Sequence, residues 1–417
     1  MSDVLPALRN DIQISIHREG GEAFLVLQDV FGFADGPIMI HSDMVSILEV
    51  CDGESTWASL AEASNVDLDG PEIMRLRAFI GQLDELGYFE TETGGRRTED
   101  GRRRWDELTV RPAVCAGSTY PADPDELRQF LDDMLSAQDP GPRTQGPGPK
   151  TQDPGLTTYH LPPTTYHLPP TTYLIPHIDY RVAPHVYAPA FNALRDTTAD
   201  LFVIIGTSHY SYDDRIILTS KHFDTPLGIV HTDTNLVTAL RPPASDLAHL
   251  PEHSIELHAV LLQHVRSHRP FTILPILVGG VGGSDDDDGL EELQAFAREL
   301  RDVVAASGRE AIWLISGDLA HVGRKFGDAV PAANMLIDVN AADRDLIGLL
   351  EGADVEGYHA AIEGTGHSFR ICGHSPTIVG LTASGVASGT LLAYDVWNET
   401  ETESAVTFAT MAFGGNR

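Results

Sequence analysis

The fold is decided by the stretch Ile315-Ser316-Gly317-Asp318-Leu319-Ala320-His321, which closes an apolar run that begins at Ala311. Such a run predicts a buried strand, and the strand ends at the Ser-Gly pair. Beyond it, Asp318 and His321 place a carboxylate and an imidazole three residues apart. Open α/β sheets carry their sites at the carboxyl ends of their strands. The stretch therefore predicts both a sheet and a functional site at one edge of it.

Two other apolar runs end in the same way. The strand expected over 172–176 is followed at once by His177, and the strand expected over 201–205 is followed by a Gly-Thr-Ser turn and His209. Cys372 lies further along the chain between Arg-Ile and Gly-His-Ser-Pro. We expect these strand ends to meet with Cys372 at one metal centre.

Strand and helix patterns alternate from residue 172 to the C-terminus. This alternation predicts an α/β fold with a mostly parallel sheet flanked by helices. The expected strands cover 172–176, 201–205, 215–219, 271–278, 311–315, 390–396 and 405–412. The expected helices cover 187–195, 234–240, 254–265, 290–306, 336–350 and 354–362.

The remaining chain divides by composition. Residues 1–92 predict a small α+β, winged-helix-like domain, with strands near 24–27 and 37–40 and helices over 44–51, 57–63 and 73–86. Residues 93–108 are rich in Gly and Arg and predict a hinge. The main domain is expected over 109–416 and carries a Pro/Gly-rich repeat insertion at 136–171. Two copies of Thr-Thr-Tyr-His-Leu-Pro-Pro place His160 and His167 in this insertion, where we expect extended chain rather than a metal-binding tract.

Composition excludes several kinds of partner. The 417 residues include 61 acidic and 28 basic side chains, a formal net charge of −33. Nucleic acids and anionic membranes attract clustered Lys and Arg, so this charge argues against both. The chain has no charged-then-apolar leader and no apolar run of about 18 residues, which predicts a soluble, cytoplasmic protein. Three cysteines, Cys51, Cys115 and Cys372, cannot form a disulfide framework.

The ligand types of the expected centre indicate its chemistry. Two neutral imidazoles and a thiolate with an open position suit a catalytic iron, copper or zinc ion, whereas a structural zinc site needs four closed ligands. The thiolate favours copper or ferrous iron over magnesium or calcium. His321 is the candidate acid–base, and Asp318 would orient its ring or favour its charged form. Arg181 and Arg370 either receive an anionic substrate group or form surface ion pairs.

Six motifs in this order resemble the Memo family, also called AmmeMemoRadiSam system protein B. They cover about residues 109–416 and read Ala-Gly-Ser-Thr-Tyr-Pro from 116, Pro-His-Ile-Asp-Tyr-Arg from 176, Gly-Thr-Ser-His from 206, Glu-His-Ser-Ile-Glu from 252, Ser-Gly-Asp-Leu-Ala-His from 316 and Cys-Gly-His-Ser-Pro from 372. The family fold is similar to that of class III, LigB-type extradiol dioxygenases.

The resemblance implies roles for these residues. It implies iron or copper, with zinc as a further option, at the family's metal ligands, which match His177, His209 and Cys372. It also implies a pocket acid–base at His321 with Asp318 beside it and a further pocket position at His253; we expect substrate contacts from Arg181, Arg370 and His374. The family carries Cys where extradiol enzymes carry a carboxylate, which argues against catechol ring cleavage. The chain departs from the commoner Pro-His-Ala-Gly-Tyr form at Asp179, which either accepts from the His177 ring or caps the next turn.

The N-terminal residues resemble PqqD-like modules that bind leader peptides. For the whole chain, the favoured function is an iron- or copper-dependent oxidoreductase acting on a small molecule or a modified peptide. The alternatives are a zinc-type hydrolase and a non-catalytic peptide-binding adaptor in a radical-SAM-associated modification system. The resemblance implies radical-SAM and AMMECR1-type proteins as partners.

Overall fold

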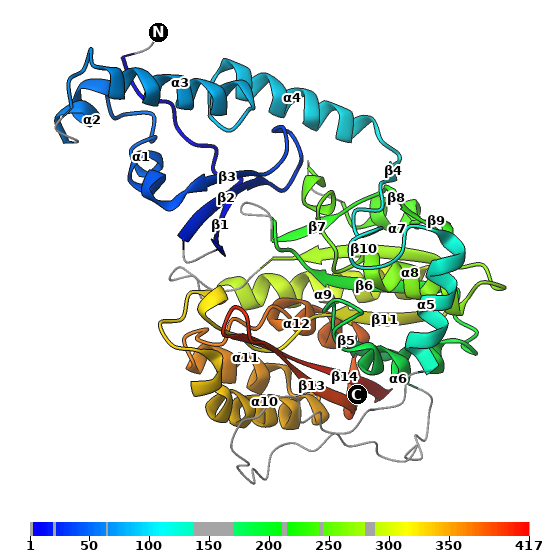
Figure 1. Cartoon of the computed structure of the whole chain (residues 1–417). Helices are drawn as coiled ribbons and strands as arrows, with labels where there is room; N and C mark the ends of the chain where they lie inside the picture. Colours follow the sequence, from blue (N-terminus) through cyan, green and yellow to red (C-terminus); the bar gives the residue numbers. More distant parts are fainter. Residues whose placement is uncertain are drawn as a thin grey trace. The chain divides into compact units, whose positions relative to one another are not determined.

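The computed structural model describes residues 3–19, 22–63, 66–136, 170–210, 215–241, 245–279 and 288–416. The chain forms two compact units, residues 1–108 and 109–417 (Figure 1). The insertion expected at 136–171, with His160 and His167, lies almost entirely outside the described residues. Among the described helices, none has the length and apolar character that crossing a bilayer requires.

The described part of the N-terminal unit contains four helices and a three-stranded antiparallel sheet of order β1-β2-β3. Its core contains Leu25 and Leu27 from the sheet and Ile73, Ile80 and Leu83 from the longest apolar-faced helix. The elements are β1 (Ile12–Glu19), β2 (Glu22–Asp29), β3 (Ile38–His41), the 3-10 turn η1 (Ser42–Met44), α1 (Val45–Glu49), α2 (Trp57–Ala63), α3 (Pro71–Glu85) and α4 (Glu92–Glu107). β1 was not predicted, although its apolar residues alternate with polar ones.

Helix α4 (Glu92–Glu107) occupies almost all of the segment 93–108 that was predicted as a hinge. The glycines that suggested flexibility allow close packing instead. A Cβ on Gly101 would lie 2.1 Å from the ring of Phe33, and one on Gly94 would overlap a backbone carbonyl. Both positions are therefore places of close approach inside a regular helix.

The second unit is built on an eight-stranded mixed sheet of order β12-β14-β5-β11-β6-β10-β7, with β13 paired to β14. The central strands β5, β11, β6 and β10 are parallel, and the outer strands are antiparallel. This arrangement confirms the predicted α/β fold. The strands are β5 (Thr172–Ile175), β6 (Leu201–Thr207), β7 (Ile216–Leu218), β10 (Thr272–Val278), β11 (Ala311–Ser316), β12 (His321–Gly323), β13 (Val386–Glu399) and β14 (Ser404–Asn416).

Helices cover both faces of this sheet (Figure 1). They are α5 (Pro124–Ser136), α6 (Pro184–Leu194), α7 (Thr234–Ala239), α8 (Glu256–Val265), α9 (Asp288–Ala306), α10 (Leu336–Glu351), α11 (Val355–Gly364) and α12 (His374–Ser384). A small three-stranded sheet adds β4 (Val110–Arg111), β8 (His222–Thr225) and β9 (Gly228–Val230), and 3-10 turns form η2 (Leu247–His249), η3 (Arg324–Phe326) and η4 (Ala332–Asn334).

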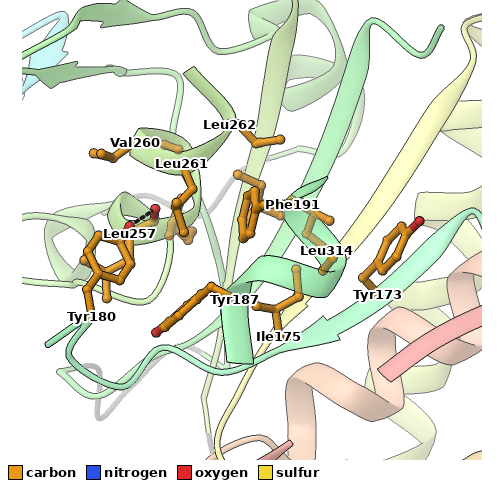
Figure 2. Packing of buried hydrophobic residues seen from close by; sticks show 14 of the residues in the cluster. Tyr173, Ile175, Tyr180, Tyr187, Phe191, Leu257, Val260, Leu261, Leu262 and Leu314 are labelled. Carbon is orange, nitrogen blue, oxygen red and sulfur yellow. Dashed lines mark hydrogen bonds between the residues drawn. The ribbon is translucent and has the colours of Figure 1, made fainter. Parts of the chain in front are cut away.

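The sheet has a core on each face, because strand side chains alternate. In β6, Phe202 and Ile204 join one cluster, whereas Val203 and Ile205 join the other. Figure 2 shows the first cluster, in which Tyr187 and Phe191 of α6 lie among leucines of α8 and β11. Each strand buried on both faces is therefore a continuous apolar run, which is why these strands were predictable from the sequence.

Candidate metal centre

Three parallel strands end side by side and deliver the residues of the candidate site. Ser316 of β11 pairs in register with Ile175 of β5 and Gly206 of β6. His177 and Asp318 each follow this row by two residues, so both lie at the carboxyl edge of the sheet. The turn after β11 needs Gly317, because a Cβ there would lie 2.4 Å from the Cα of Gly373. The close approach of these two glycines brings the loop that carries Cys372 over the strand ends.

The structure brings His177, His209 and Cys372 together. One ligand atom from each lies within 4.8 Å of the others. The Nε2 atom of His177 is 3.4 Å from the Sγ atom of Cys372. Two ligands of one tetrahedral ion, at typical metal–nitrogen and metal–sulfur distances, are about 3.6 Å apart. The nitrogen and the sulfur therefore have the spacing of atoms that bind one ion.

The ring of His177 is fixed as one tautomer. Its Nδ1 atom is 3.0 Å from the hydroxyl of Ser316, and that hydroxyl donates its own hydrogen to the carbonyl of Ser254 at 2.7 Å. The hydroxyl must therefore accept from Nδ1–H, which leaves a lone pair on Nε2 facing Cys372. Burial lowers the pKa of His177 well below its usual value, so the ring is a neutral ligand.

Glu252 fixes the ring of His209. The carboxylate is 1% exposed, and each of its oxygens is 3.1 Å from the Nδ1 atom of His209. It also accepts the backbone N–H groups of His209, His253 and Ser254 at 2.8, 2.9 and 3.0 Å. Nδ1–H therefore points at Glu252, and Nε2 is left for a ligand role. Sequence reasoning assigned no role to Glu252, although it is the first residue of a motif that includes His253.

Charge on Glu252 also changes the protonation of its neighbours. Burial lowers the pKa of His209, but the charges and hydrogen bonds of Glu252 and Cys372 together outweigh it and leave that pKa well above the usual value. Burial would raise the pKa of Glu252, yet the charge and hydrogen bonds of His209 bring it well below the usual range. Burial raises the pKa of the Cys372 thiol, and its hydrogen bond with His209 opposes the rise. Without a metal, His209 therefore carries a proton beside the sulfur of Cys372.

His253 forms the open side of the cluster. Its ring stacks on His209, with centroids 5.1 Å apart and planes 16° apart, and meets His177 edge-on at 5.1 Å. The side chains of His209 and His253 are 29% and 33% exposed, whereas that of His177 is 2% exposed. Burial lowers the pKa of His253, so its ring is neutral at pH 7. The site is therefore closed around His177 and accessible beside the other two rings.

Asp318 and His321 also approach Cys372, and their ligand atoms lie within 4.8 Å of its sulfur and of each other. The Asp318 carboxylate accepts the backbone N–H of His177 at 3.0 Å, and the Asp318 backbone N–H donates to the sulfur at 3.3 Å. Burial raises the pKa of Asp318 to about 7. A carboxyl with this pKa can hold or release a proton near neutral pH.

The expectation that Asp318 orients His321 or favours its charged form is wrong. The Nδ1 atom of His321 is 3.2 Å from the carbonyl of Leu319 and 3.1 Å from that of Arg370. These two acceptors hold the ring and leave its Nε2 as the acceptor nitrogen. Burial lowers the pKa of His321 to about 4, so the ring is neutral rather than charged.

The two arginines expected at a substrate are paired with acidic residues of the chain. Arg181 binds Asp179, which also accepts the Arg181 backbone N–H at 2.9 Å. Asp179 therefore caps the turn, and the partner of the His177 ring is Ser316 instead. Arg370 pairs with Asp328 at 2.8 Å. The ion-pair alternative is therefore the one observed for both arginines.

His374 lies in a different cluster from the one expected. It is 4% exposed at the first residue of α12, and its Nε2 atom is 3.0 Å from the Nδ1 atom of His359 in α11. Its ring also contacts Tyr358 and His367. Although only Gly373 separates it from Cys372, the start of the helix turns its side chain towards α11.

Comparison with known proteins gives a consistent result. A family model described as "Memo-like protein" matches residues 111–412. A "MEMO1 family protein" of Aquifex aeolicus is 27% identical over 404 residues, covering 94% of this chain and 96% of the relative. A "MEMO1 family protein" of Methanosarcina mazei is 30% identical over 220 residues, covering 51% and 72%, and one of Methanopyrus kandleri is 29% identical over 303 residues, covering 68% and 90%. The Aquifex alignment extends into the N-terminal unit.

Proposed function

The chain belongs to the Memo-like protein family, and from that premise we propose that it is a metal-dependent oxidoreductase acting on a small molecule or a modified peptide. The observation that carries the proposal is the convergence of two imidazoles and a thiol within 4.8 Å, with a carboxyl and a third imidazole beside the same sulfur. His177, His209 and Cys372 would hold the ion.

The donor set fits iron or copper. Both imidazoles have Nδ1 committed to an acceptor, Ser316 for His177 and Glu252 for His209, so each can offer Nε2. The thiol supplies a soft donor, which favours copper or ferrous iron over ions that prefer oxygen. When bound, such an ion would supply one-electron chemistry towards dioxygen. Binding requires Cys372 and His209 to lose their protons.

Proton transfer in this site is the task of His321 and Asp318. The neutral ring of His321 has its Nδ1–H engaged by backbone carbonyls, so Nε2 can accept a proton from a substrate. Asp318, with its pKa raised to about 7 by burial, can supply or store a proton beside the same sulfur. A neutral imidazole with a lowered pKa beside a carboxyl whose pKa is raised to about 7 supports acid–base chemistry more than simple ligand binding.

The relation to LigB-type extradiol dioxygenases is part of this proposal. A single-ion site at the carboxyl edge of an α/β sheet, with an acid–base histidine beside it, supports that relation. The thiol of Cys372 in place of a carboxylate sets the chain apart from those enzymes. We therefore expect oxidation of a substrate without cleavage of a catechol ring.

The test is dioxygen uptake by protein purified anaerobically and loaded with Fe(II) or copper. Ascorbate serves as the electron donor: it loses two electrons and two protons, and dioxygen gains them as hydrogen peroxide. We expect His321→Ala to keep the metal and lose most of the uptake, and Cys372→Ser to lose the metal. Equal uptake by His321→Ala would refute the proton-transfer role of His321. Hydrolysis of p-nitrophenyl acetate by the zinc-loaded protein without dioxygen, with no uptake by the iron- or copper-loaded protein, would favour the hydrolase instead.

A second candidate function, peptide binding by a PqqD-like N-terminal unit, is supported by strand β1. Ile14 and Ile16 are 48% and 64% exposed, although they pair across the sheet with the buried Leu27 and Leu25. The apolar face of the sheet thus continues past its core to an edge strand, where an added peptide strand would cover it.

This second function has its own test. Affinity capture with the full chain should recover radical-SAM or AMMECR1-type proteins, or a peptide substrate, and Ile16→Glu should abolish the capture. An adaptor would keep these partners after His177→Ala and Cys372→Ser, because the metal centre would play no part. Capture that is unchanged in Ile16→Glu would exclude β1 as the peptide site.

A further inference from the structure

A second group of ligand-type side chains lies outside the centre described above. His359 and Glu363 are four residues apart in α11 and therefore share one face of that helix. His374 begins α12, and His367 lies in the segment between the two helices. One ligand atom from each of His359, Glu363 and His374 lies within 4.8 Å of the others.

We propose that His359, Glu363, His367 and His374, here called the α11–α12 cluster, form a second metal site that binds a divalent transition ion of the zinc type. Three imidazole nitrogens and one carboxylate oxygen are a ligand set that zinc accepts in four-coordinate sites. The cluster contains no thiol, so its chemistry differs from that of the centre at Cys372. The proposal does not depend on the oxidoreductase function.

The distances in the cluster support one shared ion. The Nδ1 atom of His359 is 3.0 Å from the Nε2 atom of His374, and the Nε2 atom of His367 is 2.9 Å from an oxygen of Glu363. That oxygen is 4.0 Å from the Nδ1 atom of His359. Two ligands of a tetrahedral zinc ion, each about 2.0–2.1 Å from it, are about 3.3 Å apart. The spacings of His359 to His374 and to Glu363 lie on both sides of this value, so small rotations of these side chains would suffice. His367 lies outside the group whose ligand atoms are all within 4.8 Å of one another, so its ring would move further to join the ion as the fourth ligand.

His367 gives an independent indication. Its Nε2 atom is buried and has no hydrogen-bond partner among the described residues, despite its closeness to Glu363. Its backbone is in the left-handed region, with φ at +58°, which few residues other than glycine adopt. A buried nitrogen without a partner costs free energy, and a cation between it and the carboxylate would satisfy both groups.

The position of the cluster links it to the first centre. His374 starts α12, and the preceding Gly373 donates its N–H to the carbonyl of Asp318 at 3.1 Å. The next residue back is Cys372, whose carbonyl accepts from the hydroxyl of Thr207 at 2.9 Å. An ion at the α11–α12 cluster would therefore fix the start of α12, and with it the loop that places the sulfur.

The two sites can be told apart by metal stoichiometry and absorption. The full chain is titrated anaerobically with Co²⁺ and then with Zn²⁺. We expect two equivalents for the wild type, one of which gives a thiolate-to-cobalt charge-transfer band. The double variant His177→Ala/Cys372→Ser should bind one equivalent without that band. His359→Gln and Glu363→Gln, at partly exposed helix positions, should each bind one equivalent of metal and keep the thiolate-to-cobalt band.

Matched controls make the outcome decisive. His268→Ala removes an exposed histidine outside both clusters and should leave two equivalents. Two equivalents in His359→Gln and in Glu363→Gln, or one equivalent in the wild type with its thiolate band intact, would overturn the proposal. A wild-type protein that binds one equivalent without the thiolate band would refute the metal centre at Cys372 and support the α11–α12 cluster as a metal site. Circular dichroism of each variant shows that the fold is kept.

Discussion

Replacing Glu252 with glutamine tests how much the candidate centre depends on a residue that would not itself bind the ion. The change removes one negative charge and replaces one carboxylate oxygen by an amide NH₂. One oxygen of Glu252 accepts the backbone N–H of His209, and the other accepts those of His253 and Ser254. In either orientation of the amide, the NH₂ group therefore faces at least one backbone N–H that can no longer donate to it.

Two effects set the expected magnitude. A buried N–H without an acceptor costs about 1–3 kcal/mol of stability. Loss of the partner that holds a metal-binding histidine typically weakens metal affinity about 10- to 100-fold, or roughly 1.4–2.7 kcal/mol. Because Glu252 is 1% exposed, water cannot replace the missing acceptor. We therefore expect Glu252→Gln to lose both stability and metal affinity.

The assay is an anaerobic metal titration against a competing chelator, with urea unfolding of the metal-free protein beside it. Glu256→Gln is the matched control: Glu256 is also buried, but it accepts the N–H groups of Val114 and Cys115 and pairs with Arg111. The control should lose stability and keep its metal affinity. Wild-type affinity in Glu252→Gln, or an equal loss in the two variants, would refute the reasoning.

Three further predictions follow from particular contacts. Burial raises the pKa of Asp343 to about 6, from 3.8. The contribution of this group to stability is therefore full below about pH 4 and is lost as the pH rises through 6. In urea unfolding, Asp343→Asn should be about 3 kcal/mol more stable than the wild type at pH 8 and similar to it at pH 4. Gly317→Ala places a Cβ 2.4 Å from the Cα of Gly373 and should cost about 1–3 kcal/mol of stability and most of the metal affinity, as measured by the same unfolding and titration experiments. Metal binding near pH 7 should release about two protons, one from His209 and one from Cys372, measured by calorimetry in buffers of different ionisation enthalpy.

The sequence was sufficient where strands are buried on both faces. The runs that became β6 and β11 are apolar until their last residues, and polar residues of the site follow their carboxyl ends. Because parallel strands in register end at one edge, His177 and Asp318 could be placed together without coordinates.

Elements without such a pattern could not be read from the sequence. Helix α12 is buried on nearly all sides, so it has no apolar stripe at helical spacing. The strand β12 is three residues long and is stabilised by pairing with β14, more than 80 residues away. The glycines of α4 suggested a hinge, whereas they fit against other parts of the N-terminal unit. In each case the deciding contact is distant in the sequence.

The same limit applied to the site. Glu252 is 43 residues from His209, and nothing in the neighbouring residues indicates that its carboxylate is buried against that ring. His374 was expected at the substrate, and it lies two residues after Cys372 in the chain. At the start of a helix each residue turns about 100° from the one before, so adjacency does not place two side chains in one pocket.

The charges of the buried cluster explain why an ion would belong there. Without a metal, the carboxylate of Glu252 is balanced by the proton on His209, and burial keeps the thiol of Cys372 neutral. If both protons leave and Asp318 keeps its own, the cluster holds two negative charges, from Glu252 and Cys372, which a buried site cannot carry unpaired. One divalent ion restores neutrality. The exchange of two protons for one divalent cation therefore keeps the net charge of the cluster the same in both states. A monovalent ion would leave one negative charge unbalanced. A site that served only stability would need neither the carboxylate nor the thiol.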